Sequence, residues 1–225
     1  MLLDIASHND KPTGRIRQKN EQLIISAAEV EFAQHGFKGA TMNNIAQRAG
    51  LPKANIHYYF NNKLELYAAV LGNIIELWDS TLNRMNPDDD PGEALTLYIA
   101  NKIEFSRQYP QASRVFAMEM VAGAPHLNEY FNDVYRNWFH SRTEVFRAWT
   151  AQGKMDPIEP AHLIFMLWSA TQQYADFAAQ IAAALGRDEL REEDFQAATR
   201  TLTHIVLKGC GVQLASEPLL RKRPR

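Results

Sequence analysis

Four polar side chains near the start of the chain carry the chemistry needed to read DNA. They occupy one face of a short predicted helix: Lys53, Asn55, His57 and Tyr58. In a major groove, a lysine or protonated histidine can meet phosphate or guanine acceptors, an asparagine can pair with adenine, and a tyrosine can donate to phosphate. A helix this short is unstable alone, so these exposed groups favour DNA binding. An ordinary polar surface is the alternative.

Two short helices joined by a tight turn are predicted to position these side chains. Thr41 is a good N-cap for the first helix, and Gly50 stands where that helix would end in a left-handed residue. Pro52 fits the first turn of the second helix. Ile56 and Phe60 fall four residues apart and define the face of the second helix that must be buried.

Two longer predicted helices flank this pair. The first runs from about Arg17 to His35 and ends at Gly36. The second begins at Lys63 and continues to about Arg84, so it connects the DNA-reading face to the rest of the chain. A lysine at the start of a helix opposes the helix dipole, and an external phosphate would explain it better than helix stability does.

This part of the sequence resembles the helix-turn-helix of the TetR family of bacterial transcriptional regulators. The matching stretch is GATMNNIAQRAGLPKANIHYYFNNKLELYAAV, and HYYF is its most specific part. The resemblance implies an all-α homodimer with an N-terminal DNA-binding head and a larger helical body for ligand binding and dimerisation. It assigns the contacts with a double-stranded DNA operator to Thr41, Arg48, Lys53, Ala54, Asn55, His57, Tyr58 and Lys63. One departure is Pro52, which stands where many members have a capping serine.

The chain is predicted to have four parts. Residues 1–16 form a flexible N-terminal arm, and residues 17–62 form the helix-turn-helix DNA-binding domain. Residues 63–212 form the ligand-binding and dimerisation domain, and residues 213–225 form a disordered basic tail. Because the sequence has no strand pattern and no internal repeat, we expect an all-α fold.

Prolines and glycines divide the body into further predicted helices. One starts at Pro91 after an Asp90 cap, another spans about 126–151 and ends at Gly153, and a third, nearly all apolar, spans about 160–185. Heptad-like spacing marks this third helix and the last one through Leu163, Leu167, Ala170, Tyr174, Phe177, Ile181, Phe195, Ala198, Leu202 and Ile205. These seams favour a four-helix dimer interface, and the alternative is that they serve only the internal core.

The apolar third helix also offers groups that could bind a small planar effector. On one side it carries Phe165, Trp168, Ser169, Gln172 and Asp176. A glutamine amide can pair with the N–H and C=O of a uracil-like imide, while a tryptophan can stack on its ring. Trp78, on the helix that begins at Lys63, would supply a second wall. Core packing is the alternative role for each aromatic residue.

The body also resembles a subgroup of this family, the regulators of pyrimidine utilisation. The stretches that carry this resemblance are EFSRQYPQASRVFAMEMVAGAPHL and HLIFMLWSATQQYADFAAQI. The resemblance implies a ligand-responsive regulator with a pyrimidine effector such as uracil or thymine. We expect a repressor that binds a palindromic operator as a dimer, because one short recognition helix reads only a few bases and two-fold protein symmetry should be mirrored in the DNA.

Composition and charge agree with a DNA-binding head on a globular body. The 225-residue chain is 46% hydrophobic and 22% charged, with a net charge of -2. Residues 11–63 contain eight Lys and Arg against three Asp and Glu, whereas residues 64–220 contain twelve against twenty-one. The basic excess therefore coincides with the predicted DNA-binding domain.

The remaining signals exclude several classes of site. Cys210 is the single cysteine, which excludes an intramolecular disulfide and leaves too few thiolates for a structural zinc site. We expect no metal and no cofactor. No run of residues approaches the roughly 18 consecutive apolar residues of a membrane span, so we expect no membrane partner. The N-terminus has acidic residues where a signal peptide has cations, so we expect a cytoplasmic location.

Two other functions stay open at the level of sequence. A helical hydrolase or transferase is one, although His126, His140 and His162 form no closely spaced pair and no Gly-rich phosphate loop or GxSxG motif is present. The other is an architectural DNA-binding protein with a filled core and no effector.

Overall fold

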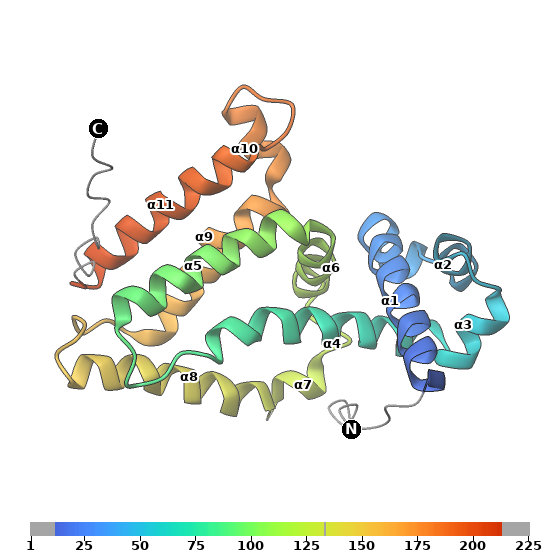
Figure 1. The fold of residues 1–225 in the computed structure, drawn as a ribbon, viewed down its shortest axis with the longest axis horizontal. Helices are drawn as coiled ribbons and strands as arrows, with labels where there is room; N and C mark the ends of the chain where they lie inside the picture. Colours follow the sequence, from blue (N-terminus) through green and yellow to red (C-terminus); the bar gives the residue numbers. More distant parts are fainter. Residues whose placement is uncertain (1–11, 133, 213–225) are drawn as a thin grey trace, which may run out of the picture. The chain divides into compact units, whose positions relative to one another are not determined.

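A computed structural model describes residues 12–132 and 134–212, and every regular element in these ranges is an α-helix (Figure 1). In chain order the helices are α1 (Pro12–Gly39), α2 (Met42–Ala49), α3 (Lys53–Tyr59), α4 (Lys63–Leu82), α5 (Pro91–Gln108), α6 (Pro110–Val121), α7 (Asn128–Asn132), α8 (Val134–Ala151), α9 (Pro160–Asp176), α10 (Ala178–Ala184) and α11 (Glu192–Gly209). The all-α prediction is confirmed. Among the described helices, none has the length and apolar character to cross a lipid bilayer.

The chain divides into two compact units. The head unit comprises Met1–Leu77 and Gln111–Asn128, and the body unit comprises Trp78–Pro110 and Glu129–Arg225. The head unit is larger than the predicted DNA-binding domain, because it also includes most of α4 and the segment that contains α6. The expectations for residues 1–11 of the arm and for the basic tail, 213–225, lie outside the described residues.

The start of the head unit follows the predicted helix-turn-helix closely. The Thr41 hydroxyl accepts a hydrogen bond from the backbone N–H of Asn44 at 3.1 Å and caps α2, as expected. Gly50 ends α2 with φ 65°, a left-handed conformation that favours glycine. Ile56 and Phe60 are buried, which confirms the predicted inner face of α3.

Two boundaries in the head differ from the predictions. Helix α1 begins at Pro12 instead of near Arg17. Proline suits the first turn of a helix, but the residues before Arg17 lack the apolar periodicity from which a helix is predicted. Pro52 is the N-cap residue of α3, one position before the helix, and it supplies no side-chain cap. The first helix was predicted to end at Gly36; the backbone there is non-helical, with φ 65°, but α1 continues beyond this kink to Gly39.

A buried carboxylate ties the segment after α6 to α4 within the head unit. Glu119, whose side chain is 3% exposed, accepts hydrogen bonds from the Tyr67 hydroxyl at 3.1 Å and from the backbone N–H of His126 at 2.7 Å. The His126 Nδ1 lies 3.0 Å from the same carboxylate. The His126 ring also packs on Phe37, with ring centroids 4.5 Å apart. We call Glu119, Tyr67 and His126 the Glu119 anchor.

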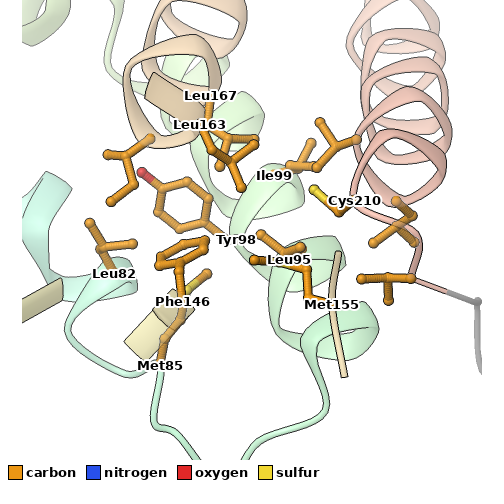
Figure 2. Packing of buried hydrophobic residues seen from close by; sticks show 14 of the residues in the cluster. Leu82, Met85, Leu95, Tyr98, Ile99, Phe146, Met155, Leu163, Leu167 and Cys210 are labelled. Carbon is orange, nitrogen blue, oxygen red and sulfur yellow. The ribbon is translucent and has the colours of Figure 1, made fainter. Parts of the chain in front are cut away.

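The hydrophobic core of the body unit is built mainly from α5, α8, α9 and α11. Figure 2 shows Tyr98 and Phe146 among the aliphatic residues of this core, with the buried Cys210 at its side. Trp149 is fully buried, and its indole N–H is satisfied because it donates to the Asn86 carbonyl at 3.1 Å. Asp90 caps α5 by accepting from the backbone N–H of Glu93, as predicted.

The predicted helix over residues 160–185 is not continuous. Phe177, with φ −120° and ψ 29°, separates α9 from α10. No glycine or proline marks this break, and the alanines that follow favour helix, so the sequence pattern could not reveal it. Similarly, the expected helix over 126–151 is described as α7 and α8, on either side of position 133, which is outside the described residues.

The predicted dimer seam is partly a core feature. Leu163, Leu167 and Ala198 are buried within the body unit, so the alternative interpretation holds for them. By contrast, Phe177 and Ile205 are 53% and 56% exposed, and they remain available to an outside partner. The heptad-like rhythm therefore combined inner and outer positions of α9, α10 and α11.

The Glu119 anchor gives a first prediction. Replacing Glu119 by alanine leaves the Tyr67 hydroxyl and a backbone N–H without their buried acceptor, and we expect the free energy of unfolding to fall by about 3 kcal/mol. Urea unfolding of the full chain measures this loss. The control is Glu129→Ala, which removes an exposed carboxylate and should change stability by less than about 0.5 kcal/mol. Equal effects of the two substitutions would contradict the role given to the anchor.

Candidate DNA interface and effector site

Helix α3 presents most of the side chains that were predicted to contact DNA. Its exposed residues are Lys53, Ala54, Asn55, His57 and Tyr58, and Tyr58 is 72% exposed. Only Ile56 in this helix is buried, at 0% exposure. The inner residue holds the helix on the head, while a cation, an amide, an imidazole and a phenol face outward. This arrangement suits insertion into a DNA major groove.

Helix α2 is attached to α1 through the buried carboxylate of Glu31. Asn44 donates to this carboxylate at 2.9 Å, and the Arg48 guanidinium lies 3.4 Å from it and donates to Gln34 at 3.0 Å. Glu31, Asn44 and Arg48 line a surface hollow of ≈ 440 Å³ together with His35 and Gln47. Arg48, which was predicted to contact DNA, therefore already interacts with two side chains of α1. Thr41, also a predicted DNA contact, is exposed at the N-terminus of α2.

Lys63 has internal acceptors that the sequence could not show. Its ammonium group donates to the Ala40 carbonyl at 2.9 Å and to the Lys38 carbonyl at 3.4 Å. It also lies 4.7 Å from the centre of the Phe37 ring. These contacts join the start of α4 to the segment between α1 and α2. They explain the lysine without an external phosphate, so the argument that favoured phosphate is corrected, and a DNA contact by Lys63 stays a prediction.

The predicted effector residues on α9 fall into two groups. Trp168 and Gln172 are half-buried, and the Trp168 indole donates to the Tyr98 hydroxyl at 2.8 Å. Phe165 and Ser169 are exposed, and the Ser169 hydroxyl donates to the Met166 carbonyl. A helix turns by about 100° per residue, so Ser169 points well away from Trp168. Trp168 and Ser169 lie at the two edges of the predicted side, which spans about 100° and includes all five α9 residues.

Two other predicted residues, Trp78 and Asp176, interact with a buried lysine. Lys102 of α5 is 3% exposed, and its ammonium group lies 4.5 Å from the centre of the Trp78 ring. Burial lowers the pKa of Lys102 to about 8, while the charges of Asp79 and Asp176 act to raise it. The lysine therefore lies against an aromatic ring, and two carboxylates act on it electrostatically.

Asp79 connects this lysine to the surrounding tyrosines. Burial raises the pKa of Asp79 to about 6, while a hydrogen bond from Tyr130 and the charge of Lys102 act in the opposite direction. The Tyr130 hydroxyl donates to Asp79 at 3.3 Å. Burial, with the charge of Asp79, also raises the pKa of Tyr135 to about 12. We call this group the buried polar cluster, and its members are Asp79, Tyr98, Lys102, Tyr130, Tyr135 and Asp176.

Sequence reasoning missed most of this cluster, although α5 carried one signal. Lys102 interrupts a helical face whose other members, such as Ile99 and Ile103, are buried and apolar. A charged residue on such a face is expensive unless it has partners, so it marks a functional candidate. Asp79 and Tyr130 gave no such signal, because their contacts join distant parts of the chain. In the described part of the chain, no group of His, Cys, Asp or Glu residues could hold a metal ion.

Comparison with known families matches both halves of the chain. Residues 24–70 match the family of bacterial regulatory proteins called the tetR family. Residues 71–213 match the C-terminal region of YcdC-like proteins. The helix-turn-helix residues of α2 and α3 lie within the first match, and the buried polar cluster lies within the second.

Individual relatives agree with these matches. The chain is 40% identical over 202 residues to the HTH-type transcriptional regulator RutR of Escherichia coli and of Shigella flexneri, covering 88% of this chain and 95% of each relative. It is 28% identical to the HTH-type transcriptional repressor SCO4008 of Streptomyces coelicolor, covering 79% of this chain and 92% of that one.

Solved structures show the same fold at lower identity. A TetR-like transcriptional regulator from a Rhodococcus species has a TM-score of 0.61 at 20% identity, covering 88% of this chain and 97% of that one. The fatty acid degradation regulator FadR from Bacillus halodurans has a TM-score of 0.63 at 17% identity, covering 92% of this chain and all of that one, 100%. With the family matches and the exposed face of α3, these findings lead to one conclusion: the chain belongs to the tetR family of bacterial regulatory proteins and is a DNA-binding transcriptional regulator.

Proposed function

We propose that this regulator is a cytoplasmic repressor that binds a palindromic operator as a homodimer and is released by a planar pyrimidine such as uracil or thymine. The observation that carries the proposal is the exposed polar face of α3, held on the head by the buried Ile56. One helix of this length reads only a few base pairs. Two copies are needed for a specific site, and a two-fold dimer calls for a two-fold operator.

The proposed DNA contacts divide into residues that recognise bases and residues that bind the phosphate backbone. Lys53, Asn55 and His57 would read bases, because lysine and asparagine have matching partners on guanine and adenine edges. Thr41 and Tyr58 would position phosphates through their hydroxyl groups. Lys63 would add its charge to the phosphate contacts while it keeps its hydrogen bonds inside the head.

The proposed dimer interface uses the exposed apolar residues at the end of the body. Phe177, Leu185 and Ile205 are each at least half exposed, and they belong to the α9–α11 region. Large apolar side chains of this kind are typical of a surface that another protein covers. In a two-fold dimer the same residues of both copies would meet.

The proposed effector follows from the side chains on one face of α9 and from the resemblance of the body to other regulators. The sequence of the body resembles the regulators of pyrimidine utilisation, and this resemblance suggests a pyrimidine effector. In this chain, Gln172 lies one helical turn from both Trp168 and Asp176, so an amide stands between an indole and a carboxylate. An imide ring could stack on an indole and pair with the amide. An enzyme has less support, since the relatives are named as regulators.

The first test of this function is the stoichiometry of the complex with DNA. We expect a dimer in solution and one dimer on each operator, with half-sites centred about one helical turn or a multiple of it apart. Sedimentation velocity and footprinting on sites selected from genomic DNA measure both quantities. A stable monomer with full affinity for a single half-site would refute the proposed dimer.

A second test separates base reading from positioning. Asn55→Ala should weaken binding to the operator by about 1–3 kcal/mol and leave binding to random DNA nearly unchanged, because only the base contact is lost. Fluorescence anisotropy on the two DNAs gives this difference. Asn137→Ala, an exposed asparagine of α8, is the matched control. If Asn55→Ala weakens both DNAs equally, Asn55 does not read a base.

A third test concerns the response to the effector. Gln172→Leu keeps roughly the volume of the side chain and removes both polar groups, so the variant should dimerise and bind the operator but lose its response to uracil and thymine. In the wild type the response should be a five- to 150-fold change in operator affinity, about 1–3 kcal/mol of coupling. Gln173→Leu, at an exposed neighbouring position, should keep the full response. A normal response of Gln172→Leu would mean that Gln172 is only a core residue.

A further inference from the structure

We propose that the start of α1 makes a second contact with DNA, in which Arg17 and Lys19 bind phosphate groups of the backbone beside the groove that α3 enters. This inference rests on the proposed function and deepens it, because it adds a phosphate-binding surface outside the helix-turn-helix. Both residues precede the stretch that carries the helix-turn-helix resemblance, which begins at Gly39.

The first support is the attachment of α1 to the end of α3. The Asn20 amide donates to the Tyr59 hydroxyl at 3.4 Å, and the Tyr59 ring meets the Tyr58 ring edge-on, with centroids 5.2 Å apart. Tyr58 is 72% exposed and is one of the proposed phosphate contacts. Figure 1 shows the dark-blue start of α1 beside α3, within the head unit. The start of α1 therefore borders the exposed surface of α3.

The second support is that α1 continues past its contact with α3. Ile16 lies one helical turn before Asn20 on the same face of α1, and it is 65% exposed. Arg17 shares this face with Asn20, whereas Lys19 is turned by about 100° around the helix, and both cations are exposed. The segment from Pro12 to Lys19 therefore extends about 12 Å beyond the Asn20 contact and can reach a neighbouring molecule.

The third support is the charge of this segment. In the described part of the chain, neither Arg17 nor Lys19 has a hydrogen bond or an ion pair, and Glu21, one turn after Arg17, does not pair with it. By contrast, Arg48 and Lys63 have acceptors within the head unit. Cations at the start of a helix oppose the helix dipole, and the first turn of α1 has no acidic residue to offset them. An external anion would offset this unfavourable interaction.

Phosphate is the part of DNA that suits these two side chains best. A guanidinium can donate two parallel hydrogen bonds to one phosphate, and an ammonium group acts as a point charge beside another. Contacts of this kind fix the position of a protein on the duplex and carry no direct information about sequence. Arg17 and Lys19 would therefore hold α3 in register without changing the bases that it reads.

The experiment measures binding of the full-length dimer to two duplexes, the selected operator and a random sequence of equal length, by fluorescence anisotropy from about 50 to about 200 mM KCl. Arg17→Gln and Lys19→Gln each remove one cation from each protomer. If each cation neutralises one phosphate, each substitution should make the slope of log K against log [salt] less steep by about 1.8 for the dimer. Affinity should fall by the same factor on both duplexes, because the lost contact is independent of sequence.

Two kinds of control accompany these variants. Arg200→Gln and Lys208→Gln remove exposed cations of α11 in the body unit, so they should leave the slope unchanged. Arg17→Lys keeps the charge at the start of α1 and should retain the slope of the wild type. A lowered slope in the α11 variants as well would show a general effect of net charge and would overturn the local contact.

The outcomes separate this inference from the proposed function. If the wild type binds neither duplex, the proposed function fails and this inference fails with it. If the wild type binds and both Arg17→Gln and Lys19→Gln keep its slope, α1 makes no phosphate contact, while the proposed function stands. If the two variants weaken binding to the operator but not to random DNA, these residues read bases, and the assignment to phosphate is wrong.

Discussion

The exposed polar face of α3 depends on one constraint: a helix of seven residues is not stable by itself in water. Helix α3 is stable because Ile56 is buried and because the turn before it is fixed by the left-handed Gly50. The rest of the head unit supports that contact. Glu31 attaches α2 to α1, and Lys63 attaches the start of α4 to the carbonyls that precede α2. The exposed face of α3 is thus presented by a scaffold whose polar groups are largely satisfied.

The body unit combines an apolar core with buried polar groups. Its core is apolar around Phe146 and Trp149, but next to it lies a cluster of charged and phenolic groups. Such a cluster adds little stability, because desolvation of Lys102 and Asp79 offsets much of their mutual attraction. An apolar core would be simpler to build.

The sequence predicted local features well and long-range contacts poorly. The caps at Thr41 and Asp90, the turn at Gly50 and the buried face of α3 depend on neighbouring residues, so they could be read from spacing. The break at Phe177 had no glycine or proline to mark it. The partners of Lys63 and Lys102 come from distant segments, and no local pattern carries that information. For the candidate site, the spacing placed the α9 residues on one side of the helix, but it could not give their partners on other helices, such as Tyr98.

The central claim is that DNA and the effector bind to one molecule whose two functions are energetically coupled. Coupling of this kind is reciprocal: if the effector weakens operator binding by some factor, the operator must weaken effector binding by the same factor. The direct measurement is the affinity for uracil of the free dimer and of the dimer saturated with operator DNA. The account predicts a weaker affinity in the complex, by the factor that uracil imposes on operator binding. Equal affinities in the two states would contradict it.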